Sequence, residues 1–133
     1  MHTKTLLVIG SEDNEPLIDA LFATGATIAV RHTLEGAVDL LRHETPAAVV
    51  VDCASAPVDP LEVVLNVRDL SNTAPVVVVG AGGEAEKRLL KGFDQTVLVD
   101  ANDGHATAVR RRIEALLRPR RVPKASTPPK EKL

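Results

Sequence analysis

Five short apolar segments, rich in β-branched residues and bounded by turn-forming residues, recur along the first hundred positions of the chain. They cover residues 5–9, 27–30, 47–51, 75–79 and 96–99. Segments of this length and composition are typical of strands that are buried on both faces of a sheet. The pattern therefore predicts five strands, of which 27–30 is the weakest.

Between these segments, apolar residues recur three and four positions apart, as on one face of a helix. The predicted helices cover residues 14–23, 33–42, 60–70, 84–91 and 106–117. Thr33 is a candidate N-cap, and Gly25 and Pro119 follow predicted helix ends. The regular alternation predicts a three-layer α/β/α domain, in which helices cover both faces of a doubly wound, five-stranded parallel sheet.

The chain has the composition of one folded domain followed by a polar tail. Its 133 residues are 44% apolar, with two phenylalanines and no tryptophan or tyrosine, so the core must be aliphatic. Residues 118–133 hold four of the nine prolines together with lysine, serine and threonine. Such a composition cannot bury a core. We therefore predict a domain over residues 1–117 and a basic, disordered tail over residues 118–133.

Charge is divided unevenly between these two parts. The chain has a net charge of −2, and the tail carries six basic residues against one acid, which leaves the body strongly acidic. An acidic body makes nucleic acid a poor candidate partner. The tail, together with the basic run at residues 110–112, could contact nucleic acid, an anionic membrane or an acidic protein, or could simply keep the chain soluble.

Cysteine usage and the N-terminus indicate a cytoplasmic protein. The single cysteine, Cys53, excludes an internal disulfide, and the adjacent Asp52 predicts a raised thiol pKa. The N-terminus lacks a secretory pattern, and no apolar segment approaches the roughly 18 residues of a membrane span. The four histidines show no metal-ligand spacing.

Polar and flexible residues follow four of the predicted strands, at the edge where parallel sheets carry their functional groups. Asp52 ends the most apolar strand, and a proline-containing loop leads to Asp59, seven residues later. In this segment the chain resembles the receiver domains of bacterial response regulators. The resemblance extends over about residues 4–117 and implies a flavodoxin-like topology with strand order 2-1-3-4-5. It also places Asp52 at the phosphoacceptor position, although an acid at a strand end is equally consistent with a turn former.

The resemblance implies a pocket around Asp52 in which several positions are occupied by other residue types. An acidic pair after the first strand normally holds a divalent cation, usually magnesium, through its oxygen atoms. Gly10 and Ser11 stand in those places, and Glu12 and Asp13 follow them. We expect these two acids to be solvated at a helix start, where the helix dipole favours them.

Gly80 and Asp100 depart further from the receiver pattern. Gly80 stands where a serine or threonine normally bonds a phosphoryl oxygen, and Asp100 stands where a lysine normally neutralises its charge. The aromatic residue expected three positions before that lysine is replaced by Val97. Two unit charges about 5 Å apart near a protein surface interact by roughly 3 kcal/mol. Exchanging the lysine for an acid therefore predicts poor phosphorylation of Asp52, or none.

We interpret the body as an atypical receiver, or pseudo-receiver, that serves as a phosphorylation-independent protein-interaction module in bacterial signalling and is not an enzyme. Its partner would be a protein, such as a histidine kinase or a downstream signalling protein, and no cofactor is expected. By analogy with receivers, the partner face would be formed by the fourth helix, the fifth strand and the fifth helix. Four aliphatic residues represent that face and could also support a homodimer: Leu89, Leu90, Val97 and Val109.

Two alternatives stay open. The first is a phosphorylatable single-domain response regulator that accepts a phosphoryl group on Asp52, with magnesium held by Glu12 or Asp13 together with Asp52. The second is a small-ligand-binding α/β module that uses the glycine-rich segment 80–83, because glycines let backbone amides approach an anion. An enzyme with its own turnover is disfavoured, since no nucleophile–base pair is visible.

Overall fold

The computed structural model describes residues 4–70, 73–102 and 104–118. The strands are β1 (Thr5–Ile9), β2 (Thr27–Arg31), β3 (Ala48–Asp52), β4 (Val76–Val79) and β5 (Thr96–Val99). The helices are α1 (Glu15–Phe22), α2 (Leu34–Leu41), α3 (Pro60–Asp69), α4 (Glu84–Lys91) and α5 (His105–Leu117). All ten predicted elements are present, with bounds within one residue of the prediction. The predicted tail lies outside the described residues, apart from Arg118. No helix in the described ranges combines the length and apolar character that a membrane crossing requires.

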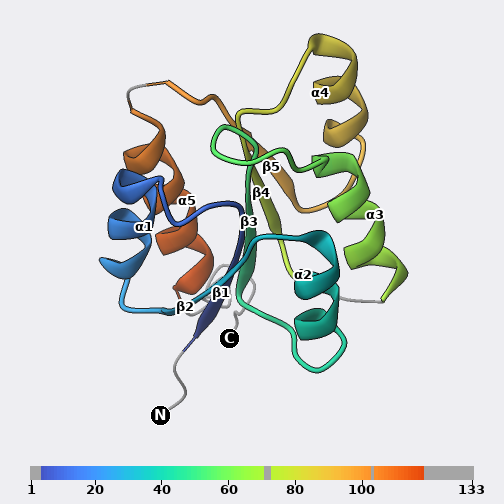
Figure 1. The fold of residues 1–133 in the computed structure, drawn as a ribbon. Helices are drawn as coiled ribbons and strands as arrows, with labels where there is room; N and C mark the ends of the chain where they lie inside the picture. Colours follow the sequence, from blue (N-terminus) through green and yellow to red (C-terminus); the bar gives the residue numbers. More distant parts are fainter. Residues whose placement is uncertain (1–3, 71–72, 103, 119–133) are drawn as a thin grey trace, which may run out of the picture.

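The strands form one parallel sheet in the order β2-β1-β3-β4-β5. Helices α1 and α5 cover one face of the sheet, and α2, α3 and α4 cover the other (Figure 1). This arrangement confirms the doubly wound sheet and the flavodoxin-like strand order. The order reverses between β1 and β3, so the carboxyl ends of these two strands border the position at which such folds place their functional groups.

Strands β3 and β4 form the centre of an aliphatic core. Every residue of both strands is buried, because each strand has a neighbour on either side and helices on both faces. Val49 and Val51 pack toward α2, α3 and α4, whereas Val50 packs toward α1 and α5. The edge strands β2 and β5 are at most half-buried. The best-packed part of the sheet therefore fixes the end of β3, where Asp52 lies.

Short polar residues define the starts of the helices that follow β1, β2 and β3. Asn14 caps α1, Thr33 caps α2 as predicted, and Asp59 caps α3, each by accepting backbone N–H groups of the first helical turn. Pro60 fits at the first position of α3, because the missing amide hydrogen is not needed there. Asp59, the acid seven residues after Asp52, thus has a structural role at a helix start.

The aliphatic face predicted for partner binding is not a continuous surface. Leu90 and Val109 are fully buried, and they lie on opposite faces of the sheet. The prediction that they share an interaction face is therefore wrong, because their helices turn both residues toward the core. Val97 is half-buried, and of the four residues only Leu89 is well exposed, at 58%.

Candidate functional site

Among the residues that the structure describes, Asp52 is the one buried polar or charged residue, with an exposed fraction of 0%. Its carboxylate accepts three hydrogen bonds. The Ala54 N–H donates to Oδ1 at 3.2 Å, and Oδ2 accepts from Ser55 Oγ at 2.6 Å and from Asn14 Nδ2 at 2.9 Å. Hydrogen bonds to a charged acceptor are the strong ones, so this set offsets much of the cost of burying the carboxylate.

The amide of Asn14 extends this network to α5. Its Nδ2 also lies 3.3 Å from His105 Nε2, and His105 Nδ1 lies 2.8 Å from the backbone carbonyl oxygen of Asn102. A carbonyl oxygen only accepts, so Nδ1 donates to it, and Nε2, which faces the donating amide of Asn14, accepts from it. Because Asn14 also caps α1, one side chain joins the start of α1, the end of β3 and the start of α5.

Gly10 and Ser11, which stand where the acidic pair was expected, bring no acid next to Asp52. A Cβ atom built on Gly10 would lie 2.9 Å from Asp52 Cβ, which is closer than such atoms approach in proteins, so a side chain has no room there. Ser11 uses its backbone N–H to donate to Ser55 Oγ at 3.3 Å, and its own hydroxyl oxygen accepts from the Asp13 N–H at 3.0 Å. Gly10 therefore lets β1 pass close to Asp52, and Ser11 supports the loops around it.

Glu12 and Asp13 are exposed, as predicted. Glu12 Oε1 lies 2.9 Å from His32 Nε2, beyond the end of β2, so this acid is paired with a different partner. Within the described ranges, no group of three or more histidine, cysteine, aspartate or glutamate residues could hold a metal ion. Magnesium needs several oxygen ligands, whereas the Asp52 oxygens face an amide, a hydroxyl and a backbone N–H that all donate to them. These residues do not fit a magnesium ion as they stand.

Gly80 and Asp100 are also arranged differently from a phosphoryl-binding pocket. Gly80 has φ +74°, a backbone conformation that residues other than glycine rarely adopt. An added Cβ would also lie 3.0 Å from Ala101 Cβ. A serine or threonine is therefore disfavoured on two counts. Asp100 is exposed, and its Oδ1 lies 3.7 Å from Lys87 Nζ, a surface pair worth at most about 1 kcal/mol.

Acidic residues of the first turn of α4 lie next to the glycine-rich segment 80–83 and disfavour an anionic ligand there. The Gly82 N–H already donates to Glu86 Oε1 at 2.7 Å, and Glu84 lies in the same first turn of α4. A phosphate approaching this turn would have to displace a carboxylate and would be repelled by its charge. The alternative of a phosphate-type ligand in this segment therefore receives no support from its geometry.

Burial raises the pKa of the Cys53 thiol to about 12, and the negative charges of Glu86, Asp52 and Asp59 add to the effect. The direction agrees with the expectation from sequence, although burial rather than Asp52 is the largest cause.

Because the thiolate is the nucleophile, we expect Cys53 to be alkylated on the order of a hundredfold more slowly in the native chain than in the urea-unfolded chain at pH 8. The native rate should also rise about tenfold per pH unit between pH 8 and 10, since the thiolate fraction increases steadily below the raised pKa. Iodoacetamide labelling followed by mass spectrometry measures both rates. Equal rates in the two states would contradict the expectation.

Three members of the hydrogen-bond network around Asp52 were missed from the sequence: Asn14 and Ser55, which bond Asp52 directly, and His105, which contacts Asn14. Ser55 lies three residues after Asp52, a spacing at which a hydroxyl can reach a turn-forming carboxylate, so a local signal existed. Asn14 showed only the features of a helix start. His105 lies 91 residues from Asn14, and nothing local in the sequence indicates their contact.

No protein-family profile matches the sequence, and no curated protein matches it. Solved structures, however, match the fold. A response regulator receiver protein from Sinorhizobium medicae superposes with a TM-score of 0.70 at 16% identity, over 87% of this chain and 95% of that chain. The receiver domain of a sensor histidine kinase from Pseudomonas aeruginosa, described with a magnesium ion coordinated in its active site cleft, gives 0.67 at 16% identity, over 86% of this chain and 98% of that chain.

A third match comes from the chemotaxis response regulator CheY4 of Vibrio cholerae, with a TM-score of 0.64 at 15% identity, over 85% of this chain and 99% of that chain. All three matches cover nearly the whole of the matched chain. Together with the strand order, they show that the described chain has the fold of a response-regulator receiver domain.

Proposed function

We propose that this chain, which has the fold of a receiver domain, works as a phosphorylation-independent protein-interaction module in two-component signalling. One observation carries the proposal. The carboxylate of Asp52 has no exposed surface, and both of its oxygens accept hydrogen bonds from neutral groups. A nucleophile in this state is shielded from a phosphodonor.

Phosphorylation at this place would be costly in free energy. The attacking oxygen would have to leave the hydrogen bonds from Asn14 and Ser55 or from Ala54, each worth about 1.5–3 kcal/mol to a charged acceptor. The product would add a charge of about −1.5 to −2. The nearest cation at the start of α4 that the structure describes is Lys87, and it already lies 3.8 Å from Glu84 Oε2 and 3.7 Å from Asp100 Oδ1. The proposal further holds that the partner is a signalling protein met in the cytoplasm, and that the domain performs no catalysis.

The test is treatment of the full chain with acetyl phosphate and magnesium, followed by intact-mass analysis, beside an ordinary phosphorylatable receiver as positive control. We expect no phosphorylated species from this chain under conditions that convert the control. Addition of beryllofluoride should likewise leave the amide resonances of Gly10 and Asp52 unshifted. Magnesium-dependent labelling that is abolished by Asp52→Asn would overturn the proposal and favour the phosphorylatable response regulator instead.

A further inference from the structure

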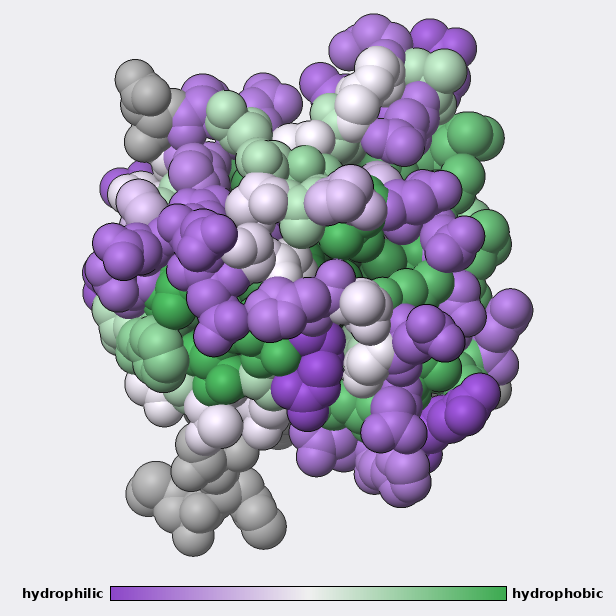
Figure 2. Space-filling model, in the orientation of Figure 1, coloured by the Kyte–Doolittle hydropathy of each residue, from purple (hydrophilic) through white to green (hydrophobic). Residues whose placement is uncertain are grey.

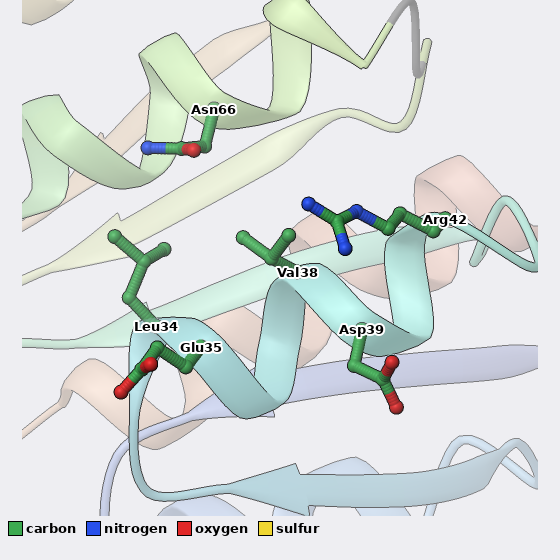
Figure 3. A pocket seen from close by; sticks show the side chains of 6 residues that line it. All are labelled: Leu34, Glu35, Val38, Asp39, Arg42 and Asn66. Atoms are coloured by element: carbon green, nitrogen blue, oxygen red, sulfur yellow. The ribbon is translucent and has the colours of Figure 1, made fainter.

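A shallow groove runs between α2 and α3, on the face of the sheet away from α1 and α5. One hollow of about 360 Å³ lies between the two helices, and a second of about 340 Å³ adjoins it at Leu34, which lines both. Figure 3 shows Leu34 and Val38 pointing from α2 toward α3, with Asn66 facing them from α3. Val58 continues the apolar lining into the second hollow.

The rim of this groove is acidic. Glu35 and Asp39 lie one turn apart on the outer side of α2 (Figure 3), Glu62 lines the adjoining hollow, and all three are exposed. Within the described part of the chain, none of them forms an ion pair with a cationic side chain. In Figure 2 hydrophobic surface lies over this region, at the right of the view, and hydrophilic residues border it. An apolar floor with an acidic rim fits a basic peptide that also carries apolar side chains.

We propose that the occupant of the α2–α3 groove is residues 119–133 of the same chain. This segment contains five basic residues and one acid, so its charge is opposite to that of the rim. It also contains four prolines, Val122 and Leu133, which supply apolar surface for the groove floor. The inference goes beyond the proposed function, because no step of it depends on the chemistry of Asp52.

The length of the segment allows it to reach the groove. Helices α5 and α2 both end at the sheet edge where the strands begin, α5 on one face and α2 on the other (Figure 1). Fifteen residues can span up to about 50 Å, whereas a folded body of this size has a radius of gyration of only about 13 Å. The segment can therefore pass below that edge. Arg42, near the end of α2, would repel basic side chains, so we expect the contacts to lie farther along, at Glu35 and Asp39.

Another hollow lies closer to the segment but suits it less. It is lined by Thr24, Glu114, Leu117 and Arg118, and its acid is already paired with a cation, since Arg110 Nε lies 3.1 Å from Glu114 Oε2. The three adjacent arginines of α5 add positive charge on that side of the molecule. Charge therefore favours the α2–α3 groove over the nearer hollow.

Paramagnetic relaxation tests this placement in the full chain. A nitroxide on Ser126→Cys, in a Cys53→Ala background, should strongly broaden the methyl resonances of Leu34 and Val38 at low salt and leave those of Ile18 on α1 sharp. The broadening should fade at about 1 M salt, where the screening length is about 3 Å. Mixing a labelled chain with an isotope-labelled chain that carries no nitroxide separates contact within one chain from contact between copies.

A matched pair of double variants makes the test specific. Glu35→Gln with Asp39→Asn should abolish the broadening, whereas Glu15→Gln with Asp19→Asn, at the same spacing on the exposed side of α1, should preserve it. Sharp Leu34 and Val38 resonances in the labelled chain would overturn the proposal. So would equal effects of the two variants, which would indicate only general attraction to an acidic body, or broadening seen only between copies.

Discussion

Replacing Gly10 by aspartate is expected to lower the free energy of unfolding by about 3–5 kcal/mol, a large share of the stability of a domain of this size. The substitution restores an acid at a place where receivers usually have one, yet here it should be harmful. The new Cβ would lie 2.9 Å from Asp52 Cβ, so β1 and β3 would have to separate. The new carboxylate would also be buried beside Asp52 with no cation to compensate it.

Urea denaturation followed by circular dichroism measures this loss in stability. Ser11→Asp is the matched control, because it adds the same charge one residue later, at a half-buried position where a carboxylate can still accept the Asp13 N–H. We expect Ser11→Asp to change stability by less than about 1 kcal/mol. A Gly10→Asp chain as stable as the parent would show that the end of β1 can open to admit a side chain.

Asp52→Ala is expected to lower the free energy of unfolding by about 3 kcal/mol, and Asp52→Asn by roughly half as much. Alanine removes the common acceptor of three donors, those of Asn14, Ser55 and Ala54, and leaves a cavity at a fully buried position. Asparagine keeps one acceptor oxygen in nearly the same shape. With that oxygen at the place of Oδ2, it still accepts from Asn14 and Ser55, and only the Ala54 N–H loses its acceptor. The ranking of the two variants thus separates loss of hydrogen bonding from loss of charge.

The same denaturation experiment gives both values, and Asp100→Ala provides the control for removing an acid. Because Asp100 is exposed and weakly paired, its loss should cost less than about 1 kcal/mol. If Asp52→Ala proved more stable than the parent, the buried carboxylate would be a strained group kept for chemistry, and the phosphorylatable alternative would gain support.

The fold was predictable because every level of the sequence agrees on it. The valine-rich segments that became β3 and β4 can be buried only at the centre of a sheet, and Thr33 marks the start of α2 by chemistry that needs no tertiary contact. The partner face was not predictable in the same way. Residues Leu90 and Val109 look alike as aliphatic helix positions, and only the packing shows that they face opposite sides of the sheet.

The candidate site was likewise predictable only in part. The position of Asp52 followed from the sequence, since it ends the most apolar strand. Its hydrogen-bond partners did not, because the bond between Asn14 and Asp52 joins residues 38 positions apart, and each residue has a separate local explanation. The positive φ of Gly80 and the lack of space at Gly10 are likewise properties of the folded backbone. Composition can show that pocket residues are absent, but only geometry shows that they no longer fit.

The hydrogen bonds that neutral groups donate to Asp52 also bear on how such a domain could carry information. A receiver that exchanges a phosphoryl group has two populations, and an upstream kinase sets their ratio. Under the proposed function, the edge of the sheet at β1 and β3 stays in a single state, so no modification there distinguishes one molecule from the next. The quantities left to vary are the number of copies in the cell and the fraction bound to a partner, both of which act by mass action. Signalling through this chain would then be set by its own amount and by the availability of its partner, rather than by a phosphotransfer reaction.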